Sequence, residues 1–195
     1  GSYYGTKKTN YAIKGLKIDF SNNLILFGNS IDTVDYDPGP GLYTLPVSPN
    51  LFHNYIVKLD SAGIFVFANR FNAIGFTTTN PFARIEDVTI DSLNNIYATY
   101  RATILLSMDI GSTVNLPIVE EGHFILKFTP QGQLNWRKRF FDDCFYNLTQ
   151  SRILIDKHWN IFATRNFNNS TADYDPSINN VFILSQNILG YQPGF

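Results

Sequence analysis

The chain repeats itself with a period of about 69 residues, and this repetition limits its fold more than any other feature. The segment 55–63 (Tyr-Ile-Val-Lys-Leu-Asp-Ser-Ala-Gly) aligns without gaps with 124–132 (Phe-Ile-Leu-Lys-Phe-Thr-Pro-Gln-Gly). A second segment, Ile-Asp followed by a polar turn, begins at Ile18, Ile90 and Ile155. Segments that recur together at one period indicate an array of equivalent structural units.

A third landmark is the tetrapeptide Asp-Tyr-Asp-Pro, which occurs at 35–38 and again at 173–176. The two copies are 138 residues apart, which is twice the period. Between them, Ser107-Met-Asp-Ile110 occupies the equivalent place with one acid lost. The landmark therefore supports three repeats.

Each unit can be divided into four short strands. Aromatic and β-branched residues are abundant, the apolar runs are four or five residues long, and no longer window keeps a helical period. The expected strands are 12–19, 23–30, 54–59 and 64–71 in the first repeat, and 84–91, 95–101, 123–128 and 133–140 in the second. The turns carry Asn or Gly for positive φ. Repeated four-stranded meanders predict an all-β fold, a partial β-propeller of four-stranded antiparallel blades.

The blades are expected at 1–71, at 72–140 and, with two strands missing, at 141–195. A propeller closes with about four to eight blades. We therefore expect the remaining blades of the same propeller to come from a longer polypeptide or from other chains.

Charge and hydropathy exclude two classes of partner. The formal net charge is −1 and the isoelectric point is near 6.3, so no strong field attracts nucleic acid. No apolar run approaches the roughly 18 residues that membrane insertion requires. Cys144 is the only cysteine, which excludes an internal disulfide framework.

The Asp-Tyr-Asp-Pro loops are the candidate chemical site. Asp35 and Asp37, with Asp173 and Asp175, could offer hard oxygen ligands to calcium. The expected role is nonetheless a turn, in which Asp35 and Asp173 accept hydrogen bonds from local amides and Asp37 and Asp175 precede a proline. No cofactor other than possible calcium is expected.

No catalytic residue is predicted. His53 and His123 lie at nearly equivalent repeat positions, and His158 lies in a hairpin turn. Cys144 follows two aspartates, which raise the pKa of a thiol rather than activating it. Arg137-Lys-Arg139 is expected on an outer strand, where a charged edge discourages strand addition.

The expected core consists of apolar residues that alternate along the strands. They are Ile18, Leu24, Leu26, Ile56, Phe65, Phe67, Ile90, Ile96, Tyr97, Ile125, Phe128, Trp136, Ile155, Ile161 and Phe162. Trp136 is expected to fill the space between two blades, with Phe67 in the same place in the first repeat.

Four motifs together resemble the SBBP-type β-propeller repeat. They are Asp-Tyr-Asp-Pro-Gly-Pro-Gly at 35–41, Ile-Val-Lys-Leu-Asp-Ser-Ala-Gly at 56–63, Trp136-x-x-x-Phe140, and Ile-Asp-Ser-Leu-Asn-Asn-Ile-Tyr at 90–97. The second repeat departs from the pattern at Ser107 and at Ile110-Gly111. The resemblance implies a secreted or cell-surface bacterial protein of the Bacteroidetes type.

We therefore expect a non-catalytic scaffold or binding module that engages protein or glycan at the cell surface. Two alternatives remain open at this point. One is a propeller enzyme that acts on polysaccharide with a site in other blades, where acids from several blades would have to converge. The other is a structural subunit of an extracellular assembly.

Overall fold

The computed structural model describes residues 11–30, 33–45, 53–73, 83–102, 106–109, 115–118, 122–141, 151–164, 171–173 and 183–185. Within these ranges all regular elements are strands, and all paired strands are antiparallel, as the sequence predicts. No described segment is an apolar helix that could cross a bilayer.

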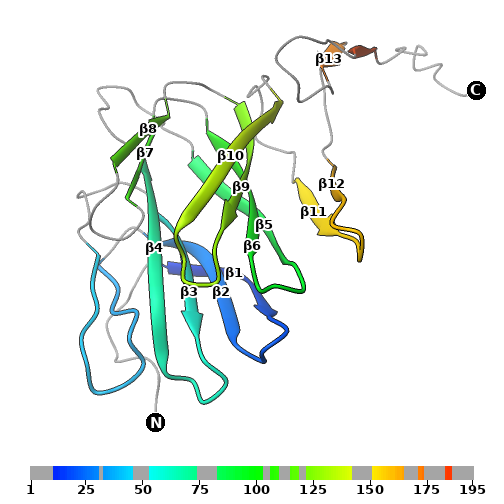
Figure 1. Cartoon of the computed structure of the whole chain (residues 1–195). Coiled ribbons are helices and arrows are strands. Elements are labelled where there is room, and N and C mark those ends of the chain that lie inside the picture. The colour runs from blue at the N-terminus through cyan, green and yellow to red at the C-terminus, as the bar shows by residue number, and fades with distance from the viewer. Residues whose placement is uncertain are drawn as a thin grey trace, which may run out of the picture.

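The strands follow one another along the chain as shown in Figure 1. They are β1 (Tyr11–Ile18), β2 (Leu24–Ser30), β3 (His53–Leu59), β4 (Phe65–Ala73), β5 (Ala83–Ile90), β6 (Ile96–Ala102), β7 (Leu106–Asp109), β8 (Asn115–Ile118), β9 (Gly122–Phe128), β10 (Leu134–Phe141), β11 (Arg152–Ile155), β12 (Ile161–Thr164), β13 (Thr171–Asp173) and β14 (Ile183–Ser185). The eight strands predicted for the first two repeats agree with the observed ones to within two residues at each end.

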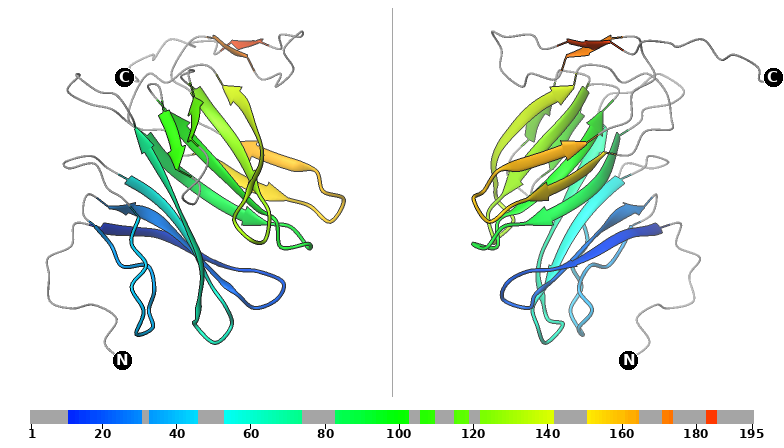
Figure 2. Two further views of the ribbon diagram at one scale, coloured as in Figure 1. Left: turned by 60° about the vertical axis from the view of Figure 1, so that its left-hand side comes forward. Right: turned by 90° about the vertical axis from the view of Figure 1, so that its right-hand side faces the viewer.

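Two four-stranded meanders form the body of the described structure. The first sheet contains β1, β2, β3 and β4 in sequence order, and the second sheet contains β5, β6, β9 and β10. The hairpin of β11 and β12, called the third hairpin below, is the corresponding start of the third repeat. Figure 2 shows the first sheet, the second sheet and the third hairpin following one another as layers.

The link between β6 and β9 differs from the expectation of two separate four-stranded blades. Its two strands, β7 and β8, leave the second sheet and extend the first, where Arg70 of β4 pairs with Asp109 and Ala73 pairs with Leu106. The first sheet therefore has six strands. An edge strand offers unpaired backbone groups, so β4 can accept a strand that comes from the next repeat.

The turns after the first strand of each repeat share one hydrogen-bond pattern. Asp19 Oδ1 accepts from the backbone N–H of Ser21 at 2.8 Å and of Asn23 at 2.9 Å, while the Asn23 amide donates to Asp19 Oδ2. Asp91 and Asp156 repeat all three bonds with the residues two and four positions later. An aspartate that accepts bonds from its own turn in this way forms an Asx turn, which stops one strand and starts the next.

Positive φ values occur where these hairpins reverse. Asn22, Asn94 and Trp159 have φ of 62°, 65° and 70° at the same position of the three repeats. Gly63 and Gly132 have φ of 81° and 85° in the turns β3–β4 and β9–β10. Asn and Gly adopt this left-handed conformation readily, whereas an aromatic residue there is an outlier.

The sheets are joined by two cores. We call the face of a sheet that points toward the following repeat its C-side face, and the opposite face its N-side face. The first core joins the C-side face of the first sheet to the N-side face of the second, and includes Ile25, Phe27, Ile56, Phe67, Ile85, Val88, Ile90, Ile96, Ala98, Tyr100, Phe124, Leu126, Phe128 and Leu134. The next core joins the second sheet to the third hairpin, through Tyr97, Ile125, Trp136, Phe140, Ile153, Ile155, Ile161 and Ala163.

The link of the first repeat covers part of the N-side face of the first sheet. Tyr36 and Leu45 are buried there, and they belong to a cluster with Val57, Leu59 and the partly buried Leu24. This cluster, called the link cluster below, leaves the β1 end of the same face open.

Most of the expected core is observed. Ile56, Ile96, Tyr97, Ile125 and Phe128 are buried. Leu24, Leu26, Phe65, Phe67, Ile90, Trp136, Ile155 and Ile161 are partly buried and packed on the cores. Trp136 meets Tyr97 edge-on, with ring centroids 6.0 Å apart.

The prediction of burial is wrong for two residues. Ile18 and Phe162 are exposed. They lie on the two faces that no further described sheet covers, the N-side face at β1 and the C-side face of the third hairpin. Their repeat position is a core position, but burial also requires a neighbour.

Candidate functional site

The first Asp-Tyr-Asp-Pro loop is built around the Asp35 carboxylate. Asp35 Oδ1 accepts hydrogen bonds from the backbone N–H of Asp37 at 3.1 Å and of Tyr43 at 2.9 Å. Asp35 also forms an isolated bridge with Thr44, and Tyr36 N–H donates to the Tyr43 carbonyl at 2.9 Å. The carboxylate therefore ties the two arms of the link together.

Asp37 turns its carboxylate onto the loop that follows it. Its Oδ1 accepts from the Gly39 N–H at 2.8 Å. A Cβ added at Gly41 would lie 2.3 Å from Asp37 Oδ2, so a side chain at that position would displace the Asp37 carboxylate. Both aspartates thus make the turn contacts that the sequence suggests, and within the described residues no group of three or more His, Cys, Asp or Glu converges as metal ligands.

The other two links have the same plan. Asp35 pairs with Thr44, Ser107 with Pro117 and Asp173 with Ile183, so the first landmark position is paired across the link in every repeat. Asp175 lies outside the described residues, and of Asp173 only the backbone is described. The calcium hypothesis stays a prediction for both loops.

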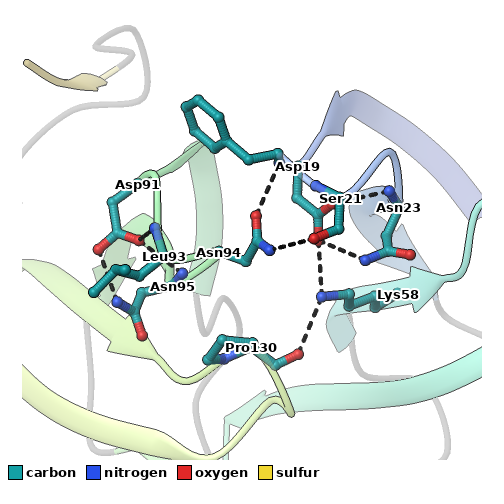
Figure 3. Close-up of polar contacts among 10 residues, drawn as sticks. Asp19, Ser21, Asn23, Lys58, Asp91, Leu93, Asn94, Asn95 and Pro130 are labelled. Atoms are coloured by element: carbon teal, nitrogen blue, oxygen red, sulfur yellow. Dashed lines mark hydrogen bonds and ion pairs between the residues drawn. The ribbon is translucent and has the colours of Figure 1, made fainter. Parts of the chain in front are cut away.

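A buried ion pair connects the first two repeats. Lys58 Nζ lies 2.9 Å from Asp19 Oδ2 and donates to the Pro130 carbonyl of the second repeat at 3.2 Å. Figure 3 shows Lys58 between the turn of Asp19 and Pro130. Burial raises the pKa of Asp19, but hydrogen bonds from Lys58, Asn23 and Ser21 outweigh it and hold that pKa below its usual value.

The turns of the first two repeats also contact each other directly. The Asn94 side chain accepts from the Phe20 N–H at 2.8 Å and donates to the Ser21 hydroxyl at 2.8 Å (Figure 3). A buried contact also joins β4 to the β9–β10 turn, where the Asn69 side chain donates to the Gly132 carbonyl at 2.6 Å. Polar side chains therefore set how the two sheets align.

Lys14 and Glu86 extend this pattern along the first strands of the repeats. Each lies in a β-bulge at the same repeat position, between Ile13 and Gly15 in β1 and between Ile85 and Asp87 in β5. Lys14 Nζ donates to the Ile85 carbonyl at 2.7 Å. Burial, with repulsion from Arg84, lowers the pKa of Lys14 to about 7.

Glu86 continues the pattern into the third repeat. Its Oε2 accepts from the Ser151 N–H at 3.0 Å and lies 3.6 Å from His123 Nδ1. Burial raises the pKa of Glu86, while hydrogen bonds from His123 and Ser151 bring it below its usual value. Asp87 lies beside it and accepts from the Ile153 N–H at 3.2 Å.

Glu86, His123 and Ser151 resemble a nucleophilic triad in composition but not in geometry. The Ser151 hydroxyl lies 3.3 Å from His123 Nδ1, the same ring nitrogen that faces Glu86. A triad needs the acid on one ring nitrogen and the nucleophile on the other, so that the imidazole can pass on a proton. The side chains of Glu86 and His123 are also 2% and 1% exposed, which keeps substrate away.

The remaining sequence candidates lie on other strands and turns or outside the described residues. His53 is buried at the start of β3, and His158 is exposed in the turn of the third hairpin, where its N–H donates to Asp156. Cys144 lies outside the described residues. Lys138 and Arg139 are exposed on β10, an edge strand of the second sheet, as predicted.

The residues that join the repeats could not be predicted from the sequence as functional candidates. Asp19, Lys58, Glu86 and Asn94 carry these contacts. A signal for Asp19 was present, because an aspartate recurs there in all three repeats. Lys14 and Glu86 gave no such signal, since the residue at their position changes from repeat to repeat.

Comparison with known proteins returns no relative. The chain matches no protein-family model, and no curated protein and no solved structure is significantly similar to it.

Proposed function

We propose that this chain is part of a β-propeller that serves as a non-catalytic scaffold or binding module. The sequence resemblance to the SBBP-type repeat supports a secreted or cell-surface bacterial protein, whose partner is a protein or a glycan.

One observation carries the proposal: two successive interfaces use the same repeat positions. Val88, Ile90, Ile96 and Ala98 line the N-side face of the second sheet in the first core. Their equivalents 65 residues later, Ile153, Ile155, Ile161 and Ala163, line the N-side face of the third hairpin in the next core.

The opposing C-side faces also correspond. Ile25, Ile56 and Phe67 of the first sheet pack on the second sheet. Tyr97, Ile125 and Trp136 hold the equivalent positions in the second sheet and pack on the third hairpin. A stacking operation that repeats with equivalent side chains is typical of propellers and other repeat arrays.

The first strands of successive repeats contact one another, as the blades of a propeller require. β5 contacts β1, together with β2, β3 and β4, on one side and β11 on the other. In a propeller the first strand of every blade lies next to the axis, beside the first strands of its neighbours. The bulged residues Lys14 and Glu86 lie on these strands, so they act between blades.

The blade packing can be tested with an engineered disulfide. The Ser21 hydroxyl lies 2.8 Å from the Asn94 amide across the two sheets. In a Cys144→Ser background, Ser21→Cys with Asn94→Cys should cross-link under mild oxidation. Ser21→Cys with Lys157→Cys is the matched control, because Lys157 lies in the equivalent turn of the third repeat, beyond the second sheet. Cross-linking of the control pair alone would overturn the blade order.

The module role is tested by a glycan array run beside a panel of polysaccharide hydrolase and lyase assays. Binding of a glycan without turnover supports a binding module. Cleavage of a polysaccharide by the purified chain would overturn the proposal that the module is non-catalytic.

A further inference from the structure

Exposed apolar side chains gather on two faces at opposite ends of the stack. On the N-side face of β1, Leu16 is 51% exposed and Ile18 is 61% exposed. On the C-side face of the third hairpin, Phe162 is 51% exposed. Apolar side chains grouped on one face often mark an interaction site.

Each of these residues is the repeat-equivalent of a residue that is buried between blades. Leu16 and Ile18 correspond to Val88 and Ile90, which pack in the first core. Phe162 corresponds to Tyr97, which packs in the next core. The two open faces are therefore the two halves of one interface that the chain already forms twice.

The open part of the N-side face is narrow. Tyr36 and Leu45 of the link cluster cover Leu24, Val57 and Leu59 on the same sheet. What stays open is the strip along β1. A two-stranded partner is wide enough for such a strip, as the third hairpin shows where it packs on β5 and β6.

We propose that two copies of this chain associate head to tail, with the C-side face of the third hairpin of one copy on the N-side face of β1 of the other. The proposal rests on the blade packing proposed above. Phe162 of one copy would approach Leu16 and Ile18 of its neighbour, as Tyr97 approaches the third hairpin within one copy. The contact is heterologous, so each copy keeps one face for a further copy.

The test is sedimentation velocity of the 195-residue chain over a concentration series. Wild type should associate as its concentration rises. Ile18→Lys and Phe162→Lys should each raise the apparent dissociation constant roughly tenfold or more, because a charge enters an apolar contact. Ile64→Lys is the matched control, since Ile64 is 63% exposed and its equivalent, Gln133, is also exposed.

A mixing experiment tests the direction of association. The Ile18→Lys chain keeps its third-hairpin face and the Phe162→Lys chain keeps its β1 face, so an equimolar mixture should form a one-to-one complex. Circular dichroism and thermal unfolding of each variant establish that it is folded.

Two results would overturn the proposal: a wild-type chain that stays monomeric at every concentration, or variants that do not complement each other. If the Ser21–Asn94 disulfide still forms in that case, the head-to-tail proposal fails while the blade packing stands.

Discussion

Lys14 and Glu86 occupy the same position in successive repeats, and each side chain binds the backbone at the corresponding position of the next repeat. Lys14 donates to the Ile85 carbonyl, and Glu86 accepts from the Ser151 N–H. The Ile85 carbonyl and the Ser151 N–H belong to equivalent peptide units of successive repeats. The basic Lys14 side chain therefore binds the negative end of the peptide dipole, and the acidic Glu86 side chain binds the positive end. A β-bulge re-aims the side chain it carries, which explains how one backbone feature serves both contacts.

The buried Lys58–Asp19 pair should be costly to break. Lys58→Met leaves the Asp19 carboxylate buried without its cation, and we expect a loss of about 3 to 5 kcal/mol in the free energy of unfolding by urea. Lys157→Met removes an exposed lysine and should change it by less than about 0.5 kcal/mol. A loss below about 1 kcal/mol for Lys58→Met would contradict a structural role for the pair.

Trp159 should be replaceable with a gain in stability. It has a φ of 70° and is largely exposed, whereas the first two repeats have Asn22 and Asn94 at this position. Trp159→Asn should raise the free energy of unfolding by about 1 kcal/mol, because asparagine tolerates the left-handed conformation. Trp159→Ala keeps the steric cost and should show no such gain. Equal effects of the two substitutions would show that the turn conformation is not the cause.

Lys14 should make stability depend on pH in the alkaline range. Its pKa is lowered from 10.5 to about 7 in the folded chain, so between these values the unfolded chain binds more protons. The free energy of unfolding should therefore rise with pH across this window. Urea unfolding at about pH 7 and about pH 9.5 should show a rise that is smaller in Lys14→Met than in wild type.

Lys157→Met is the control for that measurement and should keep the wild-type pH dependence. The upper pH is limited because burial raises the pKa of Tyr36 to about 12. Above about pH 10 the unfolded chain loses tyrosine protons that the folded chain retains, and stability falls. An unchanged rise in Lys14→Met would show that the Lys14 ammonium is not the group responsible.

The Asp35 carboxylate should act through its hydrogen bonds. Asp35→Ala removes an acceptor for two N–H groups and should cost about 0.5 to 1.5 kcal/mol, while Asp35→Asn should retain most of the stability. Thermal unfolding with calcium and with a chelator should give the same curve for wild type. A calcium-dependent rise in Tm that Asp37→Asn removes would establish a metal site instead.

The strands and turns of the first two repeats could be predicted because local sequence determines them. The Asx turn of Asp19 is complete within five residues, and so are those of Asp91 and Asp156. Positive φ at Asn22 and Gly63 likewise follows from the residue type. The period of the repeats then indicated that the resulting meanders are equivalent.

The arrangement of the candidate site could be predicted from the sequence only in part. Asp35 and Asp37 bond within their own loop, and the turn role could be proposed from the sequence for that reason. The approach of Glu86 to Ser151 joins residues 65 positions apart, and nothing in either segment indicates the other.

The sequence by itself determined the repeated strand-and-turn unit, because hydrogen bonds and steric limits within a few residues decide it. Only the tertiary structure decided which sheet receives β7 and β8, and which apolar residues are covered. Ile18 and Ile90 are both isoleucines at the same repeat position, yet Ile18 is exposed and Ile90 packs in the first core. Burial depends on the neighbouring sheet, which lies outside the repeat that carries the residue.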